Sequence, residues 1–232
     1  MRRLPVDPLA PDPAVLQPAV ALVAAGFVIA YPTDTLYGLA ADPFNAEAVA
    51  RVYEIKVRPG DRAMPLIAAD VAQVEAAFGA LPPAAHLLAA RFWPGPLTLV
   101  IPVQVHGDGV RVQVGTDASP SGGILPPPTV PVRDPRPQIR TVAVRVPAHA
   151  VARALAAQCG RPIVATSANI SGAPPTADPD EVARALEGRI PLLVDAGQAP
   201  GGPPSTIVDV SGASPRLLRA GAIAWDLVQA CL

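Results

Sequence analysis

The chain has 232 residues, of which half are hydrophobic and 16% are charged, so a buried core is expected and global disorder is excluded. Its formal net charge of −1 argues against a broad basic surface for nucleic acid. The two cysteines lie far apart and the three histidines are isolated, which argues against a disulfide framework and leaves no predicted metal site.

A proline-rich segment precedes the first predicted elements. Residues 1–13 are predicted to form a loose N-terminal arm, and they lack the apolar core of a signal peptide. The longest apolar stretch, at about residues 19–31, contains Gly26 and is too short to span a bilayer. We therefore expect a cytoplasmic protein.

The first half of the chain alternates helical and extended patterns. A helix is predicted over 15–25 with Pro18 in its first turn, and the apolar run 27–31 predicts a strand. Asn45 and Asp70 are predicted to cap two further helices at their N-termini. Those helices cover residues 46–56 and 71–78; another is expected over 83–92, and strands over 65–69 and 97–101.

The segment at about 107–140 interrupts this alternation. Its core is so rich in proline and glycine that it can form neither a helix nor a strand ladder. We predict a mobile insertion there. Residues 14–232 are then a single domain that contains it.

The alternation resumes after the insertion. Strands are predicted over 141–146 and 163–166, with a helix at 148–159 between them, and Asp178 opens another helix. Three strands and a short helix close the chain, at 191–194, 206–210, 215–219 and after Ala222. This pattern is typical of an α/β fold with a twisted, mixed parallel and antiparallel sheet surrounded by helices.

Two segments of the first half carry polar groups suited to a ligand. Residues 31–39 (YPTDTLYGL) leave the carboxyl end of a buried strand, where open α/β sheets bind ligands, although a plain connecting loop is the alternative. Lys56 and Arg58 follow in KVRPGDR, and Lys56 is the single lysine of a chain with 17 arginines. These cations suit a polyanion such as a triphosphate, unless they only complement the dipole of the preceding helix. There is no P-loop pattern.

Small hydrogen-bond donors recur in the second half. Residues 165–172 (ATSANISG) follow a strand, Ser205 precedes another strand, and Arg219 ends a third. Because the sequence has no G-x-S-x-G pattern, a nucleophilic serine is disfavoured. These side chains are predicted to bind a carboxylate or a phosphate.

Seven motifs cover roughly residues 14–224 apart from the insertion. They are YPTDTLYG (31–38), KVRP (56–59), FWPGPLTL (92–99), TVAVRVP (141–147), TSANISG (166–172), STIV (205–208) and LRAG (218–221). In this order they resemble the threonylcarbamoyl-AMP synthases, also called the YrdC family. The resemblance implies a YrdC-like fold with a large concave site.

The resemblance also implies an enzyme. Such proteins join L-threonine, bicarbonate and ATP into L-threonylcarbamoyladenylate and pyrophosphate, which is a nucleotidyl transfer. Other proteins then transfer the threonylcarbamoyl group to the adenosine beside the anticodon of certain tRNAs, and these transfer proteins are the implied partners. Mg²⁺ is expected to bind mainly through the ATP phosphates.

Nine positions of this sequence match the family's substrate-binding residues. The resemblance implies that Thr35, Arg145, Ser167 and Ser205 face threonine. It implies that Lys56, Arg58, Thr141, Asn169 and Arg219 face ATP. Lys56 and Arg58 are the predicted catalytic pair.

The chain also departs from the family pattern. Met64 and Ala69 stand where an Asn and a His are common, Ala177 replaces a serine, and Pro204 replaces an acid. Longer members carry an additional C-terminal domain, for which this chain is too short. Two interpretations of the insertion stay open, namely a flexible lid over the nucleotide and a tolerated surface loop.

Two alternative functions stay open. An RNA-binding module without catalysis would use the same cations on the phosphates of tRNA or double-stranded RNA. The neutral net charge and the absence of aromatic residues among the basic ones count against it. A related carbamoyl-adenylate-forming enzyme of metallocofactor assembly usually carries cysteine motifs, which this sequence lacks.

Overall fold

A computed structural model of the chain describes residues 1–57, 64–103 and 140–232. Arg58 and residues 107–139 of the predicted insertion lie outside the described residues. The mobile loop, the lid and the role of Arg58 therefore stay predictions.

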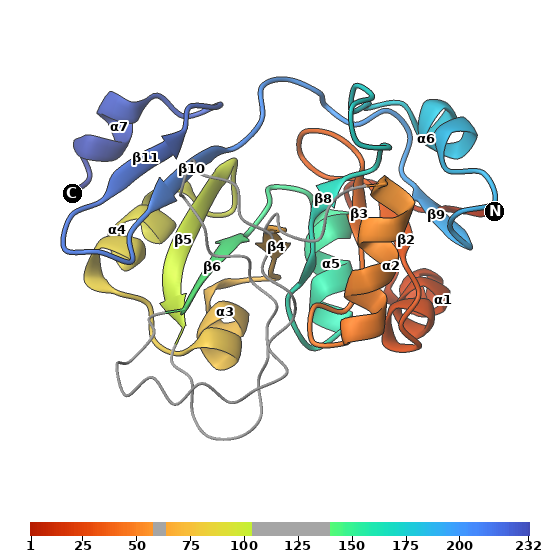
Figure 1. The fold of residues 1–232 in the computed structure, drawn as a ribbon, viewed down its shortest axis with the longest axis horizontal. Coiled ribbons are helices and arrows are strands. Elements are labelled where there is room, and N and C mark those ends of the chain that lie inside the picture. The colour runs from red at the N-terminus through yellow and green to blue at the C-terminus, as the bar shows by residue number, and fades with distance from the viewer. Residues whose placement is uncertain (58–63, 104–139) are drawn as a thin grey trace.

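The described strands form two mixed sheets that lie side by side (Figure 1). In spatial order, the first sheet contains β1 (Arg2–Pro5), β9 (Leu192–Asp195), β2 (Ile29–Tyr31), β3 (Gly38–Ala40) and β8 (Thr166–Ser167). The second contains β11 (Arg216–Arg219), β10 (Thr206–Asp209), β5 (Leu97–Val103), β6 (Arg140–Arg145), β4 (Leu66–Ile67) and β7 (Ile163–Val164). Parallel pairs such as β1 with β9 occur beside antiparallel pairs such as β5 with β6. The predicted mixed α/β architecture is confirmed, with its strands divided between two sheets.

Helices surround both sheets. They are α1 (Pro13–Ala24), α2 (Ala46–Lys56), α3 (Val71–Phe78), α4 (Pro83–Phe92), α5 (Ala150–Gln158), α6 (Pro179–Ala185) and α7 (Trp225–Gln229). In Figure 1, α1, α2 and α6 lie beside the first sheet, whereas α4 and α7 lie beside the second. Within the described ranges, no helix has the length and apolar character needed to cross a membrane.

Two hydrophobic clusters hold these layers together. One packs Leu16 of α1 and Leu155 of α5 against Ile29 of β2. The other is larger and joins the two sheets, because it contains both Leu39 of β3 and Leu99 of β5. Since protein interiors are close-packed, this shared core fixes the two sheets relative to each other.

Local capping signals predict the helix starts well. The Asn45 carboxamide accepts hydrogen bonds from the amides of Glu47 and Ala48, at 3.0 and 3.2 Å, and α2 begins at the next residue. Asp70 caps α3 in the same way through the amide of Gln73, at 2.8 Å. These side chains satisfy backbone donors that the first helical turn leaves unpaired.

The start of α1 differs from the prediction. The Asp12 carboxylate accepts from the amide of Ala14 at 2.8 Å, so the helix begins at Pro13. Pro18 consequently lies in the second turn and not in the first. A proline there removes one backbone hydrogen bond, and the burial of Leu16, Ala19 and Val23 against the rest of the fold offsets that loss.

The prediction of a loose arm over residues 1–13 is wrong for Arg2–Pro5. These residues form β1, which pairs in parallel with β9 from Arg2 opposite Leu192 to Pro5 opposite Asp195. The guanidinium of Arg3 adds ion pairs to Asp180 and Asp195, at 2.6 and 2.9 Å. The proline-rich composition predicts a loose arm. The sequence gives no local sign of the strand, because its pairing partner β9 is far away along the chain.

One predicted strand is divided between the two sheets. The segment 163–166 was expected to form one strand, but β7 pairs with β4 in the second sheet, while β8 pairs with β3 in the first. The chain crosses at Ala165, whose amide donates to the carbonyl of Pro65 at 2.8 Å. This crossing places Ser167 at the junction of the sheets.

Candidate functional site

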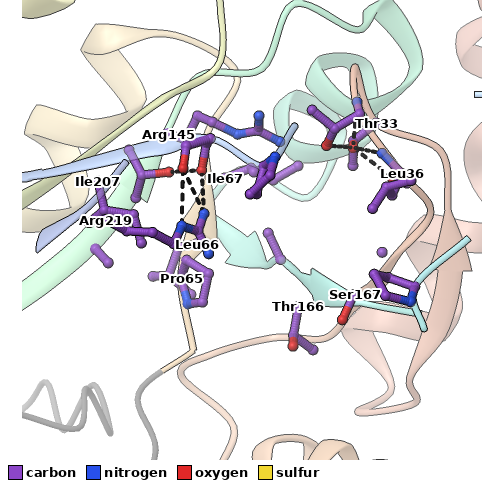
Figure 2. A pocket seen from close by; sticks show the side chains of 18 of the residues that line it. Thr33, Leu36, Pro65, Leu66, Ile67, Arg145, Thr166, Ser167, Ile207 and Arg219 are labelled. Carbon is purple, nitrogen blue, oxygen red and sulfur yellow. Dashed lines mark hydrogen bonds between the residues drawn. The ribbon is translucent and has the colours of Figure 1, made fainter. Parts of the chain in front are cut away.

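A pocket of about 710 Å³ opens where the two sheets meet. Its size suits a small-molecule substrate. Figure 2 shows Arg145 and Arg219 on one side of it, and Thr166 and Ser167 on another. The lining includes six of the nine predicted substrate residues, namely Thr35, Thr141, Arg145, Ser167, Ser205 and Arg219.

A self-bonded turn presents Thr35 to the pocket. The Thr33 hydroxyl donates to the carbonyl of Leu36 at 2.7 Å and accepts from the amides of Thr35 and Leu36 at 3.2 and 3.3 Å (Figure 2). The Thr35 carbonyl accepts a further bond from the amide of Gly201 at 2.7 Å. Because its backbone is held from both sides, the turn keeps the Thr35 hydroxyl in a defined position.

Arg145 lies at the end of β6 and is paired with Asp34. Its Nη2 lies 3.1 Å from Asp34 Oδ1, and only 9% of the arginine side chain and 11% of the aspartate side chain are exposed. The other carboxylate oxygen, Oδ2, accepts from the amide of Ala148 at 3.1 Å. Nη1 of Arg145 is buried and has no hydrogen-bond partner among the described residues. Asp34 Oδ1 likewise has no hydrogen-bond partner among the described residues, so Nη2 and Oδ1 form an ion pair without a hydrogen bond.

Arg219 and Ser205 form a second hydrogen-bonded group. Nε and Nη2 of Arg219 donate to the Ser205 carbonyl at 3.1 and 2.8 Å, and Nη2 also reaches the Ser205 hydroxyl at 3.0 Å. That hydroxyl lies 2.8 Å from the hydroxyl of Thr98. Burial and the nearby positive charge of Arg145 lower the pKa of Arg219. The pocket thus brings two cations close together.

Gly221 permits this close packing. A Cβ at this position would collide with the backbone of Pro204 and Ser205. The next residue, Ala222, donates its amide to the Pro204 carbonyl at 2.9 Å. Only glycine allows the segment after β11 to approach Ser205 so closely.

Lys56 contacts the turn that follows β8. Its Nζ donates to the carbonyls of Ser167 and Asn169, at 2.7 and 3.0 Å, and to Asn169 Oδ1 at 3.0 Å. Its side chain is buried, and neither Lys56 nor Asn169 is among the described residues that line the pocket. The Ser167 hydroxyl donates to Asn169 Oδ1 at 2.6 Å. Lys56 therefore joins α2 to the turn that presents Ser167.

Sequence reasoning missed three polar residues at this site. Thr98 is the one hydroxyl residue in the apolar run 97–101, and that interruption was the available signal. The structure buries Thr98 and places it in the pocket lining. Asp34 was visible as the one acid of its motif, but its pairing with Arg145 was not. The sequence places Tyr31 in an apolar strand, but its hydroxyl lies near the charges of Arg145 and Asp34.

Three of the four departures from the family pattern lie in the hydrophobic packing. Met64 is a buried member of the larger core, Ala177 packs against the same core, and Ala69 packs against the smaller one. Pro204 differs, because it lines the pocket beside Ser205.

The Tyr31 hydroxyl leads to a stability prediction. It is buried without a hydrogen-bond partner in the described residues, and its burial raises the pKa of the phenol. Since an unsatisfied buried polar group costs about 1–3 kcal/mol, Tyr31→Phe is expected to leave the free energy of unfolding unchanged or to raise it by up to that amount. Urea denaturation measures the change.

Tyr37→Phe is the matched control. The Tyr37 hydroxyl donates to the Gly197 carbonyl at 2.6 Å and accepts from the Ala196 amide at 3.3 Å, so its removal should destabilise the protein by about 1 kcal/mol or more. If Tyr31→Phe lowered stability as much as Tyr37→Phe, the Tyr31 hydroxyl would have to be bonded after all.

Comparison with known proteins adds an independent observation. The family model Sua5_yciO_yrdC, described as "Telomere recombination", matches residues 21–221. A threonylcarbamoyl-AMP synthase of Bacillus subtilis (strain 168) is 37% identical over 221 residues, which are 95% of this chain and 57% of that protein. Another, from Marinobacter nauticus, is 38% identical over 201 residues, which are 86% of this chain and 94% of that protein.

The fold is also similar to that of a solved structure. The crystal structure of P. abyssi Sua5 complexed with L-threonine gives a TM-score of 0.82 at 32% sequence identity and covers 100% of this chain. This chain covers 61% of that chain. It therefore spans less than two thirds of the length of both the Bacillus protein and the Sua5 structure.

Proposed function

The chain belongs to the Sua5/YciO/YrdC family, and we propose that it is an enzyme that makes L-threonylcarbamoyladenylate from L-threonine, bicarbonate or CO₂, and ATP, with release of pyrophosphate. The single catalytic domain expected over residues 14–232 then also includes β1, whose residues Arg2–Pro5 pair with β9. The observation that carries this proposal is one pocket that gathers predicted threonine and ATP residues around two arginines. The threonine in the Sua5 structure supports the choice of amino acid.

Arg145 is the proposed anchor for the carboxylate of threonine. Arg145 lines the pocket and only 9% of its side chain is exposed, and a hydrogen bond between a guanidinium and a carboxylate is charge-assisted and strong. Thr35, Ser167 and Ser205 supply hydroxyls around the same pocket. Together these groups can fix the orientation of a small amino acid.

The phosphates of ATP are assigned to the residues that the sequence predicts to face ATP. Arg219 and Thr141 line the pocket, while Lys56 and Asn169 form the hydrogen-bonded turn beside it. Arg58 completes this set on sequence grounds. Because Arg145 and Arg219 repel each other across the pocket, an anionic ligand between them would relieve that repulsion.

The chemistry then needs positioning more than acid or base groups. The amine of threonine attacks CO₂ and loses a proton, which yields an anionic carbamate. A carbamate oxygen attacks the α-phosphorus of ATP, and the bond from that phosphorus to the bridging oxygen breaks as pyrophosphate leaves. The protein holds two anions together and offsets their repulsion with its cations.

The described residues do not form a metal site of their own. They contain no group of three His, Cys, Asp or Glu side chains that could hold an ion. Asp209, the carboxylate of the pocket lining, is paired with Arg216 at 2.7 Å. Mg²⁺ is therefore expected to arrive with ATP, bound by phosphate oxygens and water, as part of the substrate.

The product implies a later step. A carbamoyl-adenylate is a mixed anhydride that a further protein can use as a donor. We propose that tRNA threonylcarbamoyl-transfer proteins consume it and modify the adenosine beside the anticodon.

The experiment that tests this function measures pyrophosphate release. The protein is incubated with ATP, bicarbonate and each amino acid in turn, and release is expected with threonine and not when bicarbonate is removed. Serine is the closest control, since it lacks only the methyl group. No threonine-dependent release, together with tight and strongly salt-dependent tRNA binding, would contradict the proposal and favour the RNA-binding alternative.

A further inference from the structure

The ion pair between Asp34 and Arg145 connects the two sheets beside the pocket, because Arg145 lines the pocket and the neighbours of Asp34, Thr33 and Thr35, line it too. Asp34 lies in the turn after β2 of the first sheet, and Arg145 is the last residue of β6 in the second. Both side chains are nearly buried, at 11% and 9% exposure. Solvent therefore screens this pair much less than a surface pair.

The carboxylate of Asp34 is itself anchored. While Oδ1 faces Arg145, Oδ2 accepts a hydrogen bond from the amide of Ala148 at 3.1 Å. Ala148 lies three residues after Arg145, on the connection between β6 and α5. The Asp34 carboxylate thus contacts this connection at both Arg145 and Ala148.

The described residues leave part of the hydrogen-bonding capacity of Arg145 unused. Nη1 has no hydrogen-bond partner among the described residues, and the paired Nη2 carries two hydrogens. Figure 2 shows the Arg145 side chain extending toward the Thr33–Leu36 turn along the edge of the pocket. A flexible arginine would lose considerable rotamer freedom on binding a ligand, and an arginine confined by burial and by an ion pair has already lost much of that freedom.

We propose that Asp34 is a positioning residue, which holds Arg145 in the orientation that binds the threonine carboxylate. This inference rests on the proposed function. A purely structural ion pair would affect folding alone. If instead Asp34 competed with the threonine carboxylate for Arg145, removing the charge of Asp34 would tighten the binding of threonine. A positioning pair predicts the opposite result, namely weaker threonine binding with little change for ATP.

Asp34→Asn is the variant that tests the proposal. The asparagine oxygen can still accept from the Ala148 amide, but its amide group cannot pair with a guanidinium. We expect the KM for threonine to rise about tenfold or more, while the KM for ATP stays within about twofold. Calorimetric titration with threonine alone should show the same loss of affinity.

Asp42→Asn is the matched control. Asp42 also accepts from a backbone amide, that of Phe44 at 2.9 Å, and also pairs with an arginine, Arg161, at 3.2 Å. Neither residue lines the pocket. This variant should keep the wild-type KM values for both substrates.

The outcomes separate this inference from the proposed function. If wild-type protein neither binds threonine nor releases pyrophosphate with it, both are overturned. If wild-type protein is active and Asp34→Asn has an unchanged or lower KM for threonine, only the inference is overturned. Should Asp34→Asn fail to fold, Asp34→Glu keeps the charge but displaces the carboxylate, and a wild-type KM for threonine in that variant overturns the inference equally.

Discussion

Replacing Lys56 by alanine is expected to reduce threonine-dependent pyrophosphate release at least about tenfold, equal to about 1.4 kcal/mol of transition-state stabilisation. Nζ of Lys56 bonds the carbonyls of Ser167 and Asn169 and the side chain of Asn169. Alanine removes one donor from each of these oxygens, although the Ser167 carbonyl keeps the Asn169 amide and Asn169 Oδ1 keeps the Ser167 hydroxyl. It also removes a positive charge next to the pocket. Initial rates at saturating ATP and threonine measure the effect. Arg58→Ala is expected to have an effect of the same size.

Arg51→Ala is the control for this prediction. Arg51 belongs to the same helix and also donates to a backbone carbonyl, but that carbonyl belongs to Gly26 and not to the turn that presents Ser167. Its replacement should leave the rate unchanged. Wild-type rates in both Lys56→Ala and Arg58→Ala would contradict a role for this motif in catalysis.

Arg145→Met is expected to lower kcat/KM for threonine by about 10- to 150-fold, because hydrogen bonds to charged groups are worth about 1.5–3 kcal/mol. It should also destabilise the protein by up to about 3–5 kcal/mol, since it leaves the carboxylate of Asp34 buried and unpaired. Kinetics with varied threonine and urea denaturation measure the two effects separately.

The double variant Asp34→Asn with Arg145→Met separates binding from stability. Removing the stranded carboxylate should restore part of the lost stability, whereas the threonine defect should persist because the guanidinium is still absent. Recovery of threonine turnover in the double variant would show that Arg145 does not bind the amino acid.

Much of the secondary structure was predictable because its signals are local. Asn45 and Asp70 cap helices within three residues of themselves, and the apolar stripe of α2 repeats within one helix. The strand runs of β5, β9 and β10 are apolar enough to identify without their partners. The boundaries then differ from the predictions by only a few residues.

Elements that depend on distant partners were missed. Strand β1 exists because β9, almost the whole chain away, offers an unpaired edge. The sequence predicts no strand at β3, yet Gly38–Ala40 pairs with both β2 and β8. The division of 163–167 between two sheets follows from the spatial positions of β4 and β3. No local pattern contains this information, because pairing is decided by long-range contacts.

The candidate site shows the same division. The sequence by itself determined which side chains carry charge or a hydroxyl, and its motifs placed Thr35, Arg145, Ser205 and Arg219 at strand ends. Only the tertiary structure decided which of these groups meet. It paired Arg145 with Asp34 from the other sheet and turned Lys56 toward Asn169. Hydrogen bonds and ion pairs act over a few ångströms, so their partners are chosen by how the sheets pack and not by distance along the chain.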